Sequence, residues 1–552
     1  MSVSLFVKKP VSALTAEAES ESGRSMRRVL GPWALVAMGM GVVIGAGLFS
    51  VTGVVAGFHT GPAITLSFVI AAVACAFAGL CYAEFASMVP VSGSAYAYTY
   101  MTMGELAAWI IGWDLVLEYA VAAVAVSISW SRYFCVFLDG LGWGLPQWMT
   151  ACPSDGGTLN VPAMVIVAFI SLLLARGTKE SSRFNDLMVA LKMFVVIAFV
   201  VLGWRYIRSE NLTPYLPANT GVFGEFGWSG VLRGAAIVFF AYIGFDAVST
   251  AAQETINPRR NMPIGILGSL AACAVVYVVF STVMTGVVDY HVYREANAMA
   301  PAAVAVQHMG HLSASGAVVP AYPWLGRAIV VAILLGYTSV IMVMLMGQSR
   351  VFFTMSRDGL LPPVFSRLHP RYRTPARSNL LFMVLVGLCA GLVPAGVAGE
   401  MTSIGTLFAF TLVCAGVIVV RRTMPHAPRA FRTPLVPLVP ALGVCCCAGM
   451  MLALPADTWI RLVIWMLIGI DVYNFYGVRH SRMSDGGEHR HGQSLLSVLG
   501  VLLAFFCIFT GFWHQTEAGW EADRTLLYVS LAFGLSHILY YCMRISLGRR
   551  LS

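Results

Sequence analysis

Residues 39–50 read GMGVVIGAGLFS, and residues 239–252 read FFAYIGFDAVSTAA. In both stretches glycine interrupts a run of apolar residues, and in the second the acidic Asp246 lies near Gly244. Glycine destabilises a helix interior by about 1 kcal/mol relative to alanine, although an isolated glycine in a membrane helix is commonly explained by close helix packing. Two glycine-interrupted helices at matching positions indicate instead an inverted-repeat transporter with its binding site near the middle of the bilayer.

The composition around these stretches is that of a membrane protein. Of the 552 residues, 58% are hydrophobic and 11% are charged, whereas soluble domains carry about 25% charged residues. A membrane-spanning helix needs about 20 predominantly apolar residues, and the residues of these runs do not alternate with a period of two, so helices are predicted and not barrel strands. The fourteen predicted spans cover residues 32–56, 62–88, 105–138, 161–175, 184–204, 229–253, 263–288, 325–353, 378–394, 402–420, 435–454, 459–476, 495–512 and 525–543.

The net charge of +9 has a topological explanation, so we expect no nucleic-acid partner. Lys and Arg concentrate in alternate predicted loops, as at Arg421 and Arg422, whereas the last loop on the other side carries Glu517, Glu521 and Asp523. Because cytoplasmic loops are the basic ones, both termini are predicted to be cytoplasmic, in a plasma membrane or a bacterial inner membrane. Residues 1–30 lack the apolar core of a signal peptide and are predicted to form a cytoplasmic arm.

Interrupted helices have a specific use in a membrane. Unwinding frees backbone N–H and C=O groups that hydrocarbon cannot satisfy. The carboxylate of an amino acid suits the free N–H groups and the positive end of a half-helix, and its ammonium group suits the freed carbonyls. The predicted ligand is therefore an amino acid. A nucleotide-binding loop is excluded, because the glycines lack the GxGxxG spacing and a preceding strand.

Four further stretches, besides residues 39–50, carry a resemblance to a known family. They are CYAEFASMVPVSGSAYAYTY at 81–100, GELAAWIIGWDLVLEYAVAAVAVSISW at 104–130, FFAYIGFDAVSTAAQETINPRRNMPIGI at 239–266 and GQSRVFFTMSRDGLLPPVFSRLHPRYRTPARSN at 347–379. Together they resemble the amino acid–polyamine–organocation superfamily and, within it, the cationic amino acid transporter family, including its bacterial members. The resemblance covers roughly residues 31–420, and the last four spans match only in number and spacing.

The resemblance implies a fold class and a domain organisation. The fold is an all-α polytopic membrane protein with a five-plus-five inverted repeat (LeuT-like), extended by four transmembrane helices to 14 in total. Spans 1, 3, 6 and 8 would line the site. The expected units are a cytoplasmic arm at 1–31, a first repeat of spans 1–5 at 32–210, a second repeat of spans 6–10 at 211–422, spans 11–12 at 423–480, and spans 13–14 with a short cytoplasmic C-terminus at 481–552.

The same resemblance assigns the substrate site to the two interrupted helices. It implies that the carboxylate binds near Gly45, Ala46 and Gly47, and that the amine binds backbone carbonyls of span 6. Some relatives have a hydroxyl residue where this chain has Ala46, so backbone contacts must hold the carboxylate. The candidate substrate-binding residues are Val43, Ile44, Gly45, Ala46 and Gly47 in span 1 and Phe240, Ala241, Tyr242, Ile243 and Phe245 in span 6.

Lys192 is the candidate proton-coupling residue. It lies in span 5 about two turns from either polar flank, and an ionisable residue near the bilayer centre costs at least about 2.5 to 3.5 kcal/mol on insertion scales. With changing access, its amine could take and release a proton during a transport cycle; the alternative is a packing or ion-pair role. Proton-coupled members of the superfamily have a lysine in this helix, where its amine occupies the place of a sodium ion in related transporters.

Five further polar residues are candidates for coupling, supporting or gating roles. Asp114 and Glu118 are four residues apart and share one helix face. Glu118 resembles the family's span 3 glutamate and is predicted to take part in proton coupling, while Asp114 supports a polar contact. Asp246 could orient the interrupted helix, and Ser339 could shape the pocket. Near an inner end, Glu84 is predicted to serve a gate or to anchor a loop.

The leading hypothesis is proton-coupled amino acid uptake by alternating access, and the alternative is amino acid exchange without proton movement. No HExxH or GxSxG motif is present, so we expect no enzyme activity, no cofactor and no metal site. A substrate-sensing receptor would need a large cytoplasmic extension. The choice between cationic and neutral substrates, the oligomeric state and the role of spans 13 and 14 stay open at this point.

Overall fold

The computed structural model describes residues 4–10, 30–88, 94–176, 181–246, 248–249, 255–295, 300–312, 318–372, 374–427, 429–482, 489–519 and 523–550. Its first half comprises η1 (Ser4–Phe6), α2 (Pro32–Val43), η2 (Gly47–Val51), α3 (Thr52–Val55), η3 (Ala56–Thr60), η4 (Gly61–Ala63), α4 (Ile64–Met88), α5 (Ser94–Thr102), α6 (Glu105–Asp139), η5 (Gln147–Met149), η6 (Pro153–Asp155), α7 (Val161–Arg176), α8 (Ser181–Gly203), η7 (Trp204–Tyr206), η8 (Ser209–Leu212), α9 (Gly227–Val238) and η9 (Phe239–Tyr242).

The second half is also almost entirely helical. It contains α10 (Pro258–Val287), α11 (Val292–Glu295), α12 (Pro301–Gln307), the strands β1 (Gly310–Leu312) and β2 (Val318–Pro320), α13 (Pro323–Arg357), α14 (Ala376–Leu392), α15 (Ala395–Thr423), α16 (Leu438–Ala453), α17 (Ala456–Val472), η11 (Tyr473–Gly477), α18 (Val478–His480), α19 (His489–Ala518) and α20 (Thr525–Arg550). The two strands form a small antiparallel hairpin.

Hydropathy confirms a protein that crosses a membrane several times. Within the described residues, nine helical stretches are long and apolar enough to cross a bilayer, and Pro32–Val43, Val161–Arg176, Ala376–Leu392 and Leu438–Ala453 are shorter apolar helices. The largest early starts are in three helices: α10 starts at Pro258, where we expected residue 263, α15 starts at Ala395, where we expected residue 402, and α19 starts at His489, where we expected residue 495. The first turns of α10 and α19 are polar, and α15 opens with AGVAGE, whose glycines and Glu400 lower the hydropathy on which the prediction relied.

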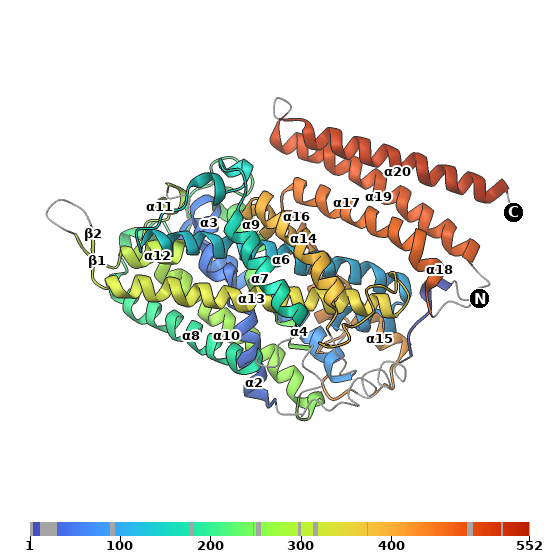
Figure 1. Ribbon diagram of the computed structural model, residues 1–552, viewed down its shortest axis with the longest axis horizontal. Helices are drawn as coiled ribbons and strands as arrows, with labels where there is room; N and C mark the ends of the chain where they lie inside the picture. The colour runs from blue at the N-terminus through green and yellow to red at the C-terminus, as the bar shows by residue number, and fades with distance from the viewer. Residues whose placement is uncertain are drawn as a thin grey trace.

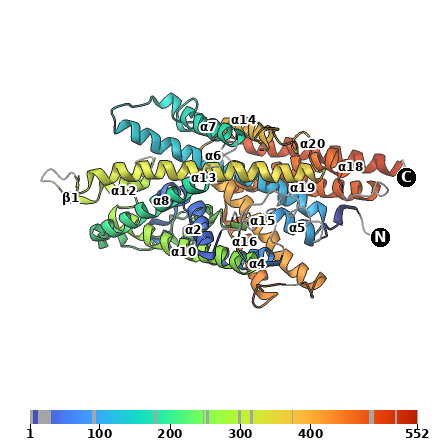
Figure 2. The same cartoon turned by 60° about the horizontal axis from the view of Figure 1, so that its bottom comes forward.

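Helix α13 runs along the long axis of the molecule, whereas α2 runs across it (Figure 1). The long helices α6 and α13 pack against each other through the middle, with α15 on the other side of α6. Helix α4 packs on α10, and α7 packs on α14. Helices α17, α19 and α20 form one edge, and the β1–β2 hairpin lies at the end opposite the two termini (Figures 1 and 2).

The end of the molecule near the termini is tied together by buried ion pairs. Arg421 Nε and Nη2 donate to Glu84 Oε1 and Oε2 at 2.8 and 2.9 Å, and the backbone N–H of Thr433 donates to Glu84 Oε2 at 2.9 Å. Glu84 therefore anchors the loop after α15 to α4. This is the second of the two roles expected for it, a gate or a loop anchor. In the N-terminal segment, Lys9 Nζ donates to Asp358 Oδ1 at 2.9 Å, which joins residues 4–10 to the end of α13.

Candidate substrate site

The first interrupted helix breaks within three residues. Helix α2 ends at Val43, Ile44 adopts an extended conformation with ψ 99°, and a new helical segment begins at Gly47. The last carbonyls of one helix and the first N–H groups of the next have no partner within their own helices. The break therefore presents both kinds of backbone group at one point in the core.

The second break lies directly against the first. Helix α9 ends at Val238, a short 3-10 turn follows to Tyr242, and Ile243 is extended with ψ 138°. Gly47 is the point of contact: a Cβ atom on this residue would lie 2.3 Å from the Cα atom of Ala241, which is backbone and cannot rotate away. Only glycine permits this approach, so the sequence places it where two backbones meet.

Lys192 reaches the first break from α8. Its Nζ atom donates to the carbonyl oxygen of Gly41 at 2.6 Å and to that of Ile44 at 3.2 Å. The side chain is 2% exposed and lies close to Gly336 of α13, because a Cβ atom there would be 2.5 Å from Lys192 Cδ. The ammonium group thus binds two carbonyls that the end of α2 leaves without helical partners.

Tyr277 of α10 connects the two breaks and was missed in the sequence, where a tyrosine in an apolar span carries no distinguishing signal. Its hydroxyl lies 2.9 Å from the carbonyl oxygen of Val43 and 2.6 Å from that of Ala241. A hydroxyl has one proton to donate. One of the two carbonyls therefore lacks a donor from Tyr277 at any moment, which leaves room for a second donor between the breaks.

The predicted side chains of span 6 point in different directions. The hydroxyl of Tyr242 donates to the carbonyl of Phe68 at 3.0 Å, toward α4. The ring of Phe245 packs on Tyr82 and Phe410. These two residues therefore support the break through packing, and its backbone atoms are the groups that face α2.

The acidic candidates gather on another side of the second break. Tyr119 OH donates to Asp246 Oδ2 at 3.0 Å. Asp114 and Glu118 flank Gly405 of α15, and both are 0–1% exposed. Within the described residues, their carboxylate oxygens have no hydrogen-bond partner, and no ion pair joins Glu118 to Lys192.

Ser339 does not reach the breaks through its hydroxyl. Its Oγ atom donates to the carbonyl of Gly336 in the same helix at 3.0 Å. Such a bond to the preceding turn satisfies the hydroxyl locally. Ser339 therefore forms part of the α13 surface beside Lys192 and offers no free donor.

An aromatic cluster of Phe49, Tyr133 and Tyr337 packs next to the first break. Tyr133 OH donates to the carbonyl of Phe49 at 2.8 Å, and Tyr337 OH and Ser50 Oγ lie 2.9 Å apart. On α6, Trp130 Nε1 donates to Thr338 Oγ1 at 3.2 Å. We call this cluster with Ser50, Trp130 and Thr338 the aromatic gate.

A family profile described as amino acid permease matches residues 30–535. The chain belongs to this family. The match confirms the resemblance to the amino acid–polyamine–organocation superfamily and indicates a membrane transporter and not an enzyme. Amino acid permease membership is consistent with the apolar helices and the overall composition.

Similar curated proteins include two from Bacillus subtilis (strain 168). The branched-chain amino acid permease BcaP is 44% identical over 489 residues, which are 88% of this chain and 100% of the relative. The methylthioribose transporter is 41% identical over 483 residues, 87% of this chain and 99% of the relative. The vacuolar cationic amino acid transporter 4 of Arabidopsis thaliana is 35% identical over 394 residues, 71% of this chain and 63% of the relative.

Proposed function

We propose that this permease is a proton-coupled amino acid symporter that works by alternating access and binds its substrate between the two helix breaks. The observation that carries the proposal is the contact of Lys192 Nζ with the carbonyls of Gly41 and Ile44. A mobile positive charge at this place can hold the break closed when charged and release it when neutral. That is what coupling one proton to one conformational cycle requires.

The proposed architecture explains why both breaks meet. Residues 32–210 and 211–422 form two five-helix inverted repeats, followed by spans 11–12 at 423–480 and spans 13–14 at 481–552, fourteen spans in all. Inverted repeats place equivalent discontinuous helices at one mid-membrane site. Both termini face the cytoplasm, with the aromatic gate on the outside. Support comes from the common location of both termini at one end of the molecule (Figure 1).

The backbone can recognise a zwitterion at this site. The substrate carboxylate accepts hydrogen bonds from N–H groups of Gly45, Ala46 and Gly47, at the positive start of the second half-helix. The ammonium group donates to carbonyls around Phe240, Ala241 and Ile243. Tyr277 can donate its one proton to only one of the two carbonyls, and the ammonium group donates to the other. Substrate binding and closure of the two breaks therefore reinforce each other.

Glu118 contributes to coupling, with Asp114 and Asp246 in supporting roles. A buried charge without a partner is costly, and within the described residues the carboxylate oxygens of Glu118 and Asp114 have no hydrogen-bond partner, so these two groups favour states in which a proton or the substrate ammonium is near. The available driving force is adequate. One charge crossing 100 mV yields about 2.3 kcal/mol, and one pH unit adds about 1.4 kcal/mol, which together sustain roughly a few-hundredfold gradient.

Neutral amino acids with apolar side chains are the proposed substrates. Next to the first break, a Cβ atom on Gly45 would meet Val340 Cγ2 at 3.4 Å, and the ring of Phe49 packs on Phe280 and Tyr337. These apolar walls suit leucine, isoleucine and valine. The names of the relatives also include cationic amino acids and methylthioribose, so a test must include both.

The decisive experiment is radiolabelled uptake into proteoliposomes with and without an inward proton gradient. The panel contains leucine, valine, alanine, arginine, lysine and methylthioribose, with wild type and Lys192→Ala. We expect the gradient to drive leucine accumulation only in wild type, while Lys192→Ala still exchanges leucine across the membrane. Uptake that ignores the gradient but requires internal amino acid would favour the exchanger, and uptake of methylthioribose alone would refute an amino acid substrate.

A further inference from the structure

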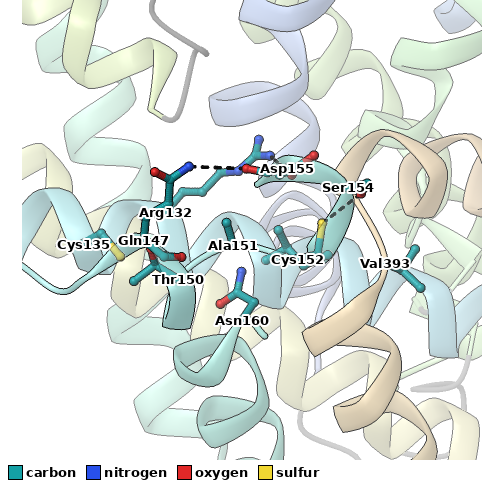
Figure 3. Close-up of a pocket in the computed structure, with 11 residues that line it drawn as sticks. Arg132, Cys135, Gln147, Thr150, Ala151, Cys152, Ser154, Asp155, Asn160 and Val393 are labelled. Atoms are coloured by element: carbon teal, nitrogen blue, oxygen red, sulfur yellow. Dashed lines mark hydrogen bonds and ion pairs between the residues drawn. The ribbon is translucent and has the colours of Figure 1, made fainter. Parts of the chain in front are cut away.

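A cavity lined by polar and apolar residues lies at the far end of α6, away from the breaks. It has a volume of about 400 Å³, within the roughly 300 to 1,000 Å³ of small-molecule sites. Its walls come from α6, from the segment between α6 and α7, and from Val393 after α14 (Figure 3). On α6, the residues at the cavity are Ile128, Arg132 and Cys135, spaced four and three apart on one helix face.

Two opposite charges face each other in this cavity. The Arg132 guanidinium and the Asp155 carboxylate are 3.6 Å apart at their nearest atoms, which is beyond hydrogen-bonding distance. Their side chains are 24% and 40% exposed. Both groups therefore keep donor and acceptor capacity that a ligand entering the cavity can use.

Asn160 supplies a buried donor with a defined orientation. It is 3% exposed, and its Oδ1 atom accepts hydrogen bonds from Ser131 Oγ at 2.6 Å and from the N–H of Ala163 at 3.2 Å. These bonds orient the amide so that Nδ2 points toward the cavity (Figure 3). In the described part of the chain, Nδ2 makes no hydrogen bond of its own. The cavity thus holds an unused buried donor beside an unsaturated ion pair.

We propose that this cavity is a second binding site for a free α-amino acid, distinct from the site between the breaks. The carboxylate of the ligand binds the Arg132 guanidinium, which matches its planar fork, and Asn160 Nδ2. The ammonium group binds the Asp155 carboxylate. The 3.6 Å ion pair between Arg132 and Asp155 is thereby replaced by two ion pairs with the ligand, one to each side chain.

The position of the cavity makes it a regulatory site for the aromatic gate. Arg132 lies between Trp130 and Tyr133, whose side chains contact Thr338 and the backbone of Phe49 from other faces of the same helix turn. A ligand that draws Arg132 toward the cavity therefore acts on a helix turn that also holds the gate. Occupancy of the cavity is expected to alter the rate of gate opening.

Cys135 lines the cavity and reports directly on its occupancy. The full-length protein in detergent is treated with N-ethylmaleimide, and the alkylation rate of each cysteine is measured by peptide mass spectrometry with and without L-leucine. We expect L-leucine to slow alkylation of Cys135 several-fold. The exposed thiols of Cys389, Cys445 and Cys542 serve as internal controls and should react at unchanged rates.

Two variants separate this site from the central one. Arg132→Gln and Asp155→Asn remove one charge each, and Asp155 lies in a surface segment where folding is not at risk. We expect both to lose the protection of Cys135 while uptake of leucine persists. N-acetyl-leucine and leucine methyl ester, each lacking one charge, should protect weakly. If Cys135 is not protected in wild type, or stays protected in both variants, the proposal is wrong, whatever the uptake assay shows for the central site.

Discussion

Replacing Gly47 by alanine tests the contact between the two helix breaks. The added Cβ atom would lie 2.3 Å from Ala241 Cα, more than 1 Å inside an ordinary carbon–carbon contact of about 3.5–4.0 Å. Because the obstructing atom is backbone, one of the breaks must move. Overpacking of this kind costs about 1–3 kcal/mol, which corresponds to roughly a 5- to 150-fold loss in an equilibrium constant.

The chain offers two matched controls for this substitution. A Cβ atom on Gly45 would meet Val340 Cγ2 at 3.4 Å, an ordinary contact, and one on Gly387 of α14 would meet no heavy atom of another described segment within 4 Å. Gly45→Ala also keeps the backbone N–H that the carboxylate needs. We therefore expect Gly45→Ala to reduce leucine uptake only mildly and Gly387→Ala to leave it unchanged.

Uptake of radiolabelled leucine in proteoliposomes measures the effect as the ratio of maximal rate to half-saturating concentration, and thermal unfolding of the detergent-solubilised variants measures stability. Gly47→Ala should lower the ratio at least fivefold, by the magnitude derived above. An equal loss in Gly45→Ala and Gly47→Ala, or full activity of Gly47→Ala, would refute the reasoning that backbone contact at this one position closes the site.

Three further outcomes follow from buried contacts. Tyr277→Phe removes the one proton that the carbonyls of Val43 and Ala241 share, at a cost of about 1–3 kcal/mol, so leucine affinity in a binding assay should fall about tenfold while the protein stays folded. Lys9→Met leaves Asp358 without its ion-pair partner and should lower the thermal unfolding temperature, whereas adding Asp358→Asn should restore part of the loss; an additive double variant would contradict this. Glu84→Gln weakens the bidentate contact with Arg421, and limited proteolysis should then cleave the loop after α15 faster than in wild type.

Local patterns in the sequence were enough to predict the membrane class and the places where helices break. Hydropathy is a property of each segment, so the helices were recognisable one at a time, and glycine marks the break near residue 45 because it is costly in a helix interior. The helix starts at Pro258 and Ala395 were missed for the same reason. The first turn of α10 is polar, and α15 opens with small residues and Glu400, whereas hydropathy alone detects only the apolar body of a helix.

The partners within the site depended on the fold. The sequence by itself determined that the chain crosses a membrane repeatedly, that the predicted spans 1 and 6 are interrupted, and that Lys192 lies deep in an apolar span. Only the tertiary structure decided that Lys192 binds the carbonyl of Gly41, 151 residues away, that Tyr277 joins the two breaks, and that Arg132 and Asp155 share a cavity. The physical reason is that these contacts form between side chains and backbone groups brought together by packing, and packing leaves no local trace in the order of residues.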